Sequence, residues 1–358
     1  MAKNTLTRRK LLATSGAAVS LNIVKSGTLF GAENSALSKL SVGFIGMGGQ
    51  IQGHVNNLVN QGQHVAAFCD VDRSQIEKSM NRHKNHVKDC KPYEDYRNLL
   101  EKEKSLDAVV IATPDHWHAP ICKAAMAAGK HVYCEKPLTH TIKEARELRD
   151  LSKASKVVTQ TGNQGSASAN LRRSMELIEA GVFGPIREIH VWHPKHNWPS
   201  GGVRPAGSDP VPEGLNWDFW CGPAPVRPYK QGIYHPVKWR GWYDFGNGFI
   251  GDFCCHSFNL ALRSLHLDYP KRISFTGEGF GTETFAKSCS VKYHFSKNAK
   301  RSHDVELNIY TGGGKDVPPD HAVEAAIKTF GSLPRVGCIF VGDKGREIER
   351  ERERERER

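Results

Sequence analysis

Three kinds of pattern are missing from this chain of 358 residues, and each absence argues against a class of protein. No stretch offers the ~20 apolar residues of a membrane-spanning helix, because Thr14, Gly16 and Asn22 interrupt the apolar segment at residues 13–24. The nine cysteines contain no C-x-x-C pair, so neither a zinc site nor a redox pair is indicated. We expect buried free thiols, or one oxidised pair in an exported protein.

A basic stripe is missing as well, although the formal net charge is +12. The basic residues before residue 33 have no acid among them, and the remaining ones are mixed with acids along the chain. A nucleic-acid-binding protein usually concentrates its Lys and Arg on one face or along one helix. The pattern therefore argues against nucleic acid as a partner and predicts a mildly basic surface that suits an anionic cofactor.

The N-terminal segment, residues 1–36, is typical of a twin-arginine export signal. Residues 7–12 read Thr-Arg-Arg-Lys-Leu-Leu, and a moderately apolar stretch follows them. This route carries proteins that have already folded. We therefore expect a periplasmic or otherwise extracytoplasmic protein that engages the twin-arginine machinery. A disordered basic tail is the alternative.

Alternating strands and helices over residues 37–160 predict a parallel sheet with helical crossovers, which is the architecture of Rossmann dinucleotide-binding domains. The expected strands are 40–45, 64–70, 108–112, 131–134 and 157–160, and the expected helices are 118–128 and 142–155. Over residues 161–346 helices are expected at 171–180 and 253–265, and strands at 186–192, 272–276, 290–295, 305–310 and 337–341. Such runs of strands predict an α+β domain with an open, mainly antiparallel sheet.

Two further segments differ from these domains in composition. The Pro/Gly/Trp-rich stretch 194–243 is too long for a simple connection, so it is expected to be a functional loop around a site. Residues 347–358 end in five Glu-Arg repeats without an apolar side chain, and this tail is expected to be disordered.

A glycine turn follows the first predicted strand. Gly46 and Gly48 let the backbone approach a pyrophosphate at a helix N-terminus, although Ile51 stands where the usual fingerprint has a third glycine or alanine. Asp70 ends the second strand, where its carboxylate can accept both ribose hydroxyls of an adenosine. It would repel a 2′-phosphate, so NAD is favoured and NADP is the alternative. Lys136, just past a later strand of the same sheet, adds to the prediction of a nicotinamide enzyme.

Several titratable residues lie at the ends of predicted elements. Asp115, His116 and His118 follow a strand at the carboxyl edge, where ligands of open α/β sheets bind. No metal site is expected from His116, His118 or His190, because no third ligand accompanies them in a recognisable pattern. Asp252 and His256 are four residues apart and share a helix face, so the carboxylate can orient the imidazole.

Five motifs occur in order along the chain: V-G-F-I-G-M-G at 42–48, A-T-P-D-H-W-H at 112–118, G-K-H-V-Y-C-E-K-P-L at 129–138, G-N-Q at 162–164 and G-D-x-x-x-H at 251–256. With them the chain resembles the Gfo/Idh/MocA oxidoreductases over roughly residues 40–345. The aromatic segments 215–223 and 239–246 resemble those of the exported twin-arginine subgroup. Family members generally continue beyond the turn at 342–345, so the second domain is expected to be incomplete.

The resemblance implies roles for individual residues. His256 would take the hydroxyl proton of the substrate, Lys136 would stabilise charge on the same oxygen, and Asp252 would orient His256. The expected substrate contacts are Trp239, Arg240 and Asn259, and Asn259 stands where many relatives carry Asp. The expected NAD contacts are Gly46, Met47, Gly48, Gly49, Gln50, Ile51, Asp70, Thr113, Pro114, His118, Glu135, Lys136 and Gln164.

The resemblance also implies an activity and a partner. We expect an NAD(P)-dependent oxidoreductase that transfers a hydride between nicotinamide and a hydroxyl of a sugar, sugar derivative or cyclitol. One alternative is an NAD-dependent glycoside-cleaving enzyme that works by transient oxidation and elimination. Another is a catalytically impaired protein that binds the cofactor or a sugar. A homo-oligomer formed through the second sheet is expected in each case.

Overall fold

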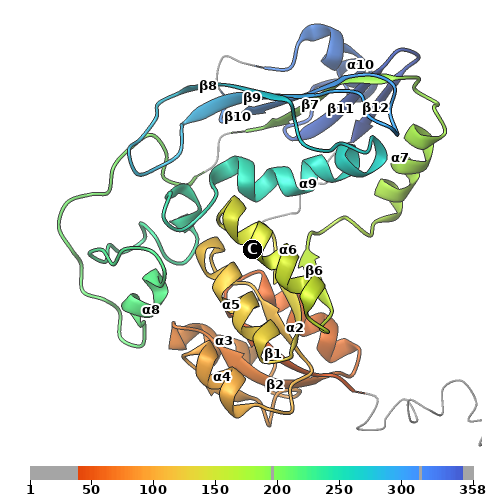
Figure 1. Cartoon of the computed structure of the whole chain (residues 1–358). Coiled ribbons are helices and arrows are strands. Elements are labelled where there is room, and N and C mark those ends of the chain that lie inside the picture. The colour runs from red at the N-terminus through yellow and green to blue at the C-terminus, as the bar shows by residue number, and fades with distance from the viewer. Residues whose placement is uncertain (1–38, 195–196, 314–316, 350–358) are drawn as a thin grey trace, which may run out of the picture. The chain divides into compact units, whose positions relative to one another are not determined.

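A computed structural model describes residues 39–194, 197–313 and 317–349, and two sheets dominate residues 41–349 (Figure 1). The twin-arginine segment and the repeats from residue 350 onward lie outside the described residues, so the expectations about them stay predictions. Residues 347–349 belong to a strand of the second sheet, so the expectation of disorder was wrong for these three residues. Among the described helices, none combines the length and the apolar character that crossing a bilayer requires.

The first sheet is parallel and has the strand order β3-β2-β1-β4-β5-β6. Its strands are β1 (Ser41–Ile45), β2 (His64–Cys69), β3 (Lys91–Tyr93), β4 (Ala108–Ile111), β5 (His131–Glu135) and β6 (Thr159–Gly162). The helices are α2 (Ile51–Asn60), α3 (Arg73–Arg82), α4 (Tyr96–Lys102), α5 (Asp115–Ala127) and α6 (Ile142–Ala154). The order reverses between β1 and β4, so their carboxyl ends form the edge where such sheets bind ligands. This arrangement confirms the predicted Rossmann fold.

Both faces of the first sheet are buried, which explains why its strands are continuous runs of apolar residues. One buried cluster packs around Ile121, Val109 and Leu148 on the side of α5 and α6, and another packs around Phe44, Val55 and Phe68 on the side of α2. The five expected strands are present, with ends shifted by two residues at most. β3 was not expected, because Lys91-Pro92-Tyr93 is short and carries a proline, which suits only an edge strand.

The second sheet is mixed and has the order β12-β11-β7-β10-β9-β8. Only β7 and β10 run parallel to each other, and the other four pairs are antiparallel, as predicted for the main part of this sheet. The strands are β7 (Ile186–His193), β8 (Arg272–Glu278), β9 (Ser288–Phe295), β10 (Val305–Thr311), β11 (Gly337–Gly342) and β12 (Arg346–Glu349). The expected homo-oligomer stays a prediction.

Helices cover both faces of this second sheet (Figure 1). On one face, α7 (Ala169–Glu179) and α9 (Gly248–Ser264) bury an apolar cluster that includes Ile189 and Val191 of β7. On the other face, α10 (Asp320–Phe330) packs its Val323 and Ala326 against Trp192. Because side chains alternate along a strand, consecutive residues of β7 point to opposite faces of the sheet. α9 begins five residues earlier than predicted, which places Asp252 inside the helix.

The aromatic stretch has a small core of its own. It contains α8 (Trp217–Cys221) and the short 3-10 helix η2 (Lys238–Gly241). Stacked and edge-on rings hold it together, with Trp217 and Trp220 4.7 Å apart between ring centroids. The segment is thus folded by its own side chains, as compact functional loops are.

Candidate active site

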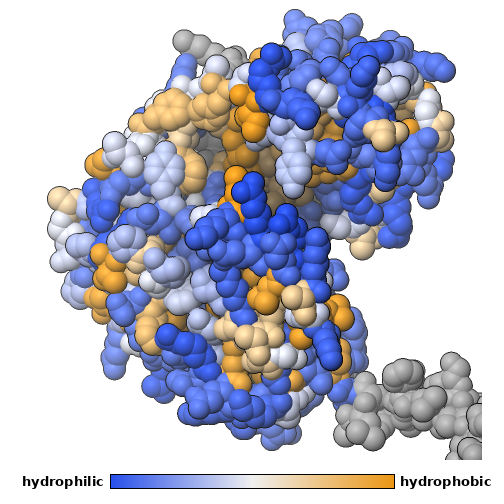
Figure 2. Space-filling model, in the orientation of Figure 1, coloured by the Kyte–Doolittle hydropathy of each residue, from blue (hydrophilic) through white to orange (hydrophobic). Residues whose placement is uncertain are grey.

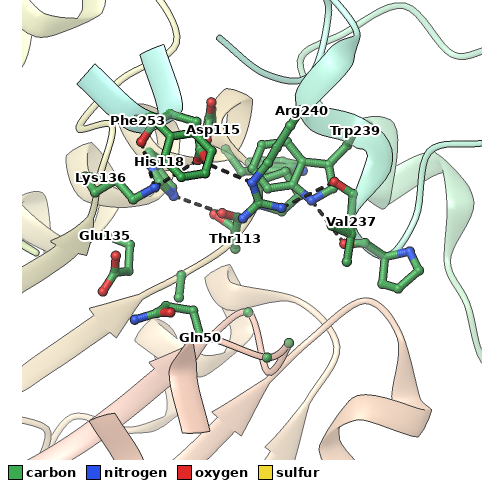
Figure 3. Close-up of a pocket in the computed structure, with 18 of the residues that line it drawn as sticks. Gln50, Thr113, Asp115, His118, Glu135, Lys136, Val237, Trp239, Arg240 and Phe253 are labelled. Atoms are coloured by element: carbon green, nitrogen blue, oxygen red, sulfur yellow. Dashed lines mark hydrogen bonds and ion pairs between the residues drawn. The ribbon is translucent and has the colours of Figure 1, made fainter. Parts of the chain in front are cut away.

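One cavity of about 1790 Å³ joins the carboxyl edge of the first sheet to α9 and to the aromatic stretch. Figure 2 shows a hollow with hydrophobic side chains in it, and Figure 3 shows residues that line the cavity. Nearly all of the site residues predicted from the sequence line this space, with Met47 and Ile51 as exceptions. The size is ample for a dinucleotide and a small substrate together.

At the Rossmann end, the glycine turn presents bare backbone to the cavity. Gly46 has a φ of +87°, and a Cβ on it would lie 2.7 Å from the backbone nitrogen of Thr113, so only glycine fits there. A Cβ on Gly48 or Gly49 would meet nothing within 4 Å, which leaves an open cradle in front of the turn. This cradle fits a pyrophosphate against the start of α2.

Asp70 lies beside this turn and is held by backbone amides. The amide of Met47 donates to its Oδ2 at 2.6 Å, and that of Asp72 donates to its Oδ1 at 2.8 Å. Burial raises the pKa of Asp70 to about 6, although both amides counteract the shift, so the carboxylate is ionised at neutral pH. Each oxygen keeps a lone pair for a ribose hydroxyl.

The side chain of Thr113 adds a second sign of a ligand. Its Oγ1 is buried and has no hydrogen-bond partner among the described residues, and Thr113 lines the cavity opposite Gly46. A buried hydroxyl without a partner is costly and indicates a group that binds there. The Thr113 hydroxyl, the glycine cradle and Asp70 together form a site that fits NAD.

The sequence-based list of NAD contacts needs one correction. Ile51 has no exposed surface, since it packs in the core beneath the turn next to Phe44 and Val55. It therefore does not face the cavity. The Met47 side chain is buried in the same cluster, so only its backbone amide serves the site, through Asp70.

Two other expected contacts organise the cavity wall. The ring nitrogens of His118 lie 2.6 Å from the carbonyl oxygen of Pro137 and 2.9 Å from that of Thr113, so His118 links the ends of β4 and β5. Glu135 accepts hydrogen bonds from Gln164 at 3.2 Å and from His54 at 2.6 Å. These bonds fix the backbone on both sides of Lys136.

Lys136 and Asp252 line the other end of the cavity. Figure 3 shows Lys136 and Arg240 there. The Lys136 ammonium donates to Oδ1 and to the backbone carbonyl oxygen of Asp252, both at 2.9 Å. The Arg240 Nε also donates to this Oδ1, at 3.3 Å. Burial alone would raise the pKa of Asp252, but the two cations outweigh it and hold the pKa below its ordinary value.

His256 lies one turn further along α9, and its partner differs from the expected one. In the described part of the chain no hydrogen bond joins it to Asp252; its Nδ1 lies 3.3 Å from the backbone carbonyl oxygen of Gln164. Lys136 and Arg240 instead bind Oδ1 of Asp252. Burial and then Lys136 lower the pKa of His256, so the ring is neutral at pH 7, with Nδ1–H donating and Nε2 able to accept.

The expected substrate residues surround this centre. The guanidinium of Arg240 stacks over Trp239, 4.2 Å from the ring centroid, and faces Trp198 at 5.6 Å. The Asn259 side chain donates to Ser166 Oγ at 2.6 Å. Trp198 was not predicted as a site residue; its place in an aromatic stretch was the only signal.

Asp115 is a site residue whose chemistry the sequence did not reveal. It is 1% exposed, lines the cavity, and accepts a hydrogen bond from the Asn247 amide at 3.0 Å. Burial, followed by the negative charge of Asp252, raises its pKa to about 8, so Asp115 is mostly protonated at pH 7. Only one of the two neighbouring carboxyl groups therefore carries a charge.

Two family models match the chain in succession. The Gfo/Idh/MocA oxidoreductase family, NAD-binding Rossmann fold, matches residues 40–163, and the C-terminal alpha/beta domain of the same oxidoreductase family matches residues 169–275. The matches follow the order of the two sheets and together cover more than half of the chain.

Curated relatives match a shorter part. An alpha-N-acetylgalactosaminidase of Tannerella forsythia is 30% identical over 154 residues, which are 41% of this chain and 33% of that protein. A glycosyl hydrolase family 109 protein of Parabacteroides distasonis is 32% identical over 161 residues, with 41% and 33% covered. The matched part thus spans about a third of the length of these relatives.

Solved structures share the fold over most of the chain. The WlbA dehydrogenase of Bordetella pertussis, in complex with NADH and UDP-GlcNAcA, has a TM-score of 0.61 at 16% identity, covering 87% of this chain and 79% of that one. A myo-inositol dehydrogenase of Lactobacillus casei, in complex with NAD(H) and myo-inositol, has 0.57 at 17%, covering 87% and 74%. With both family models matched in order and the glycine turn and Asp70 in place, the chain belongs to the Gfo/Idh/MocA oxidoreductase family and carries its NAD-binding Rossmann domain.

Proposed function

We propose that this protein oxidises a CH–OH group of a sugar, sugar derivative or cyclitol with NAD. The observation that supports it best is the position of Lys136, which lies in the same cavity as the glycine turn and is held against Asp252 at 2.9 Å. His256 lines the same cavity as a neutral imidazole. A proton acceptor and a fixed cation beside a nicotinamide site are what alcohol oxidation requires.

In this proposal each side chain has one task. Bound NAD supplies the acceptor for the hydride that leaves the substrate carbon. His256 takes the hydroxyl proton at Nε2, while its Nδ1–H stays on the Gln164 carbonyl oxygen. Lys136 donates to the same hydroxyl oxygen and stabilises the negative charge that develops there. Asp252 holds the Lys136 ammonium in place by accepting hydrogen bonds from it at Oδ1 and at the backbone carbonyl oxygen.

A carbohydrate is the favoured substrate class because of the aromatic wall. Trp198 and Trp239 line the cavity on either side of Arg240. Flat indole faces pack against the C–H faces of sugar rings, and a guanidinium between them donates to hydroxyl oxygens. The alpha-N-acetylgalactosaminidase and the dehydrogenase in complex with UDP-GlcNAcA, both named above, support the same class.

The test is NADH formation at 340 nm by the purified full chain over a panel of free sugars, uronates and cyclitols. We expect turnover with at least one of them, and its loss in Lys136→Ala with NAD binding retained. Turnover that is unchanged in Lys136→Ala would overturn the assignment. NAD titration of both proteins by fluorescence shows whether the Rossmann site is intact.

A second candidate is glycoside cleavage, which the alpha-N-acetylgalactosaminidase and the family 109 glycosyl hydrolases favour. Here bound NAD would accept a hydride from a ring carbon, and a base would remove the proton next to the new ketone. Elimination would then expel the leaving-group oxygen, which takes up a proton, and water would add to the unsaturated ketone before the hydride returns from NADH. Nitrophenyl glycosides distinguish the two. Release of nitrophenol without net NADH supports cleavage, whereas NADH formation from free sugars supports the dehydrogenase.

A further inference from the structure

Three potential metal ligands meet on the face of the second sheet that α10 covers. Glu188 and His190 are two residues apart on β7, so their side chains leave the strand on the same side. His321 lies in the first turn of α10. The Nε2 atoms of His190 and His321 lie 3.0 Å and 2.9 Å from the same oxygen, Oε2 of Glu188. All three ligand atoms lie within 4.8 Å of one another.

This cluster is separate from the NAD site. Ile189 and Val191, which alternate with His190 along β7, pack toward α7 and α9, whereas the cluster faces α10. None of its three residues lines the large cavity. The proposed oxidation therefore does not use them, and the cluster needs an explanation of its own.

The spacing of the ligand atoms, which as described are joined by hydrogen bonds, is also compatible with a metal ion between them. Around a tetrahedral ion with ligands at 2.0–2.1 Å, neighbouring ligand atoms are about 3.3 Å apart, close to the two distances from Glu188 Oε2. Two imidazoles and one carboxylate form a set that binds Zn²⁺ and leaves a position for water. His321 is 55% exposed at its side chain, which leaves room for that water.

The surroundings of His190 favour this use. Its ring is buried, with 3% exposed. Without an ion, the His190 Nε2–H donates to Glu188 Oε2 at 3.0 Å. With an ion on Nε2, the ring proton would sit on Nδ1, and the Tyr310 hydroxyl 3.1 Å away would accept it. A partner of this kind on the remote nitrogen is usual for a metal-bound histidine. The nearby Lys292 is engaged by Glu306 at 3.2 Å.

We propose that Glu188, His190 and His321 bind a divalent transition-metal ion, with Zn²⁺ as the best match. The ion joins the start of α10 to β7. Apart from this link, α10 packs through a small apolar cluster in which Val323 and Ala326 meet Trp192 and Ile339. An ion bound to the folded state alone stabilises it by mass action, so the site is structural and acts at a distance from catalysis.

The test uses the full chain, freed of metal with EDTA and dialysed, and titrates it with Zn²⁺ by calorimetry and by thermal melting. We expect calorimetry to show one more Zn²⁺-binding site in the wild type than in His321→Ala. We also expect Zn²⁺ to raise the Tm of the wild type but not that of His321→Ala. Glu188→Gln keeps the shape but is a weaker ligand, so its affinity should fall at least tenfold. His321→Ala removes an exposed side chain, and NAD titration verifies that this variant is folded.

His86→Ala serves as the matched control, since His86 is exposed and remote in sequence from the cluster. It should bind Zn²⁺ like the wild type. Equal stoichiometry and equal Tm rise in wild type and His321→Ala would overturn the proposal. So would a Tm that falls in His321→Ala but responds to Zn²⁺ in neither protein, because the three residues would then be a hydrogen-bonded group without an ion.

Discussion

Lys136 and Asp252 are joined twice, because the ammonium donates both to the Oδ1 and to the backbone carbonyl oxygen of Asp252 at 2.9 Å. The side chains are largely buried, with 13% and 7% exposed. Breaking one partner of such a pair leaves a buried charge without its counterpart. The lysine follows β5 of the Rossmann domain and the aspartate belongs to α9, so this pair connects the cofactor domain with the second domain at the cavity.

The first prediction concerns this lysine. Lys136→Ala should lower kcat/KM by ~10²- to 10⁴-fold, since it removes the donor that stabilises charge on the reacting oxygen. NAD affinity should change little, because Asp70 and the glycine turn are untouched. Steady-state kinetics and NAD titration measure the two effects. Lys143→Ala, at an 87% exposed lysine of α6, is the control and should behave as wild type.

The second prediction concerns the proton acceptor. The pKa of His256 is lowered, first by burial and then by Lys136, so the ring gains its proton at a lower pH than a free imidazole does. The acid limb of kcat/KM should therefore lie below pH 6.5, where His256 gains a proton and can no longer accept one. His256→Gln should lower activity and abolish this limb. An acid limb that persists unchanged in the variant would assign the proton to another group.

The fold was largely predictable from the sequence, whereas the contacts within the site were only partly so. Apolar runs and glycine turns locate β1, β4 and β5 because burial on both faces demands such runs. The i,i+4 spacing of Asp252 and His256 fixes a shared helix face but not a partner. Their partners, Lys136 and the Gln164 carbonyl oxygen, come from segments about 90 to 120 residues away and depend on how the domains pack. The burial that keeps Asp115 protonated is equally invisible in the sequence.

The third prediction tests the nucleotide cradle. Gly46→Ala puts a Cβ 2.7 Å from the Thr113 nitrogen in a left-handed backbone, so it should weaken NAD binding strongly and destabilise the fold. Gly53→Ala is the matched control: a Cβ there meets nothing within 4 Å, and alanine favours helix α2 by about 0.5–1 kcal/mol. NAD titration and thermal melting of both variants measure the contrast. Equal NAD affinity in the two variants would place the nucleotide elsewhere.

The fourth prediction follows from Asp115. Its pKa is raised from 3.8 to about 8, so between these values the folded state binds a proton that the unfolded state has lost. The free energy of unfolding should therefore decrease as the pH rises through this window, by at most about 1.4 kcal/mol per pH unit from this group. Asp115→Asn mimics the protonated form and should remove this part of the slope.

Urea unfolding of wild type and Asp115→Asn at pH 5, 6, 7 and 8 measures the slope. The exposed Asp89→Asn is the control and should retain the wild-type slope. The alkaline limb of the pH–activity profile should also depend on Asp115. A charged Asp115 beside Asp252 would attract Lys136 and Arg240 away from the substrate, so Asp115→Asn should extend activity above pH 8. If Asp115→Asn destabilises the protein equally at all four pH values, then Asp115 is ionised over this whole range. In that case Asp115 and Asp252 would both carry a negative charge beside Lys136, contrary to the assignment made above.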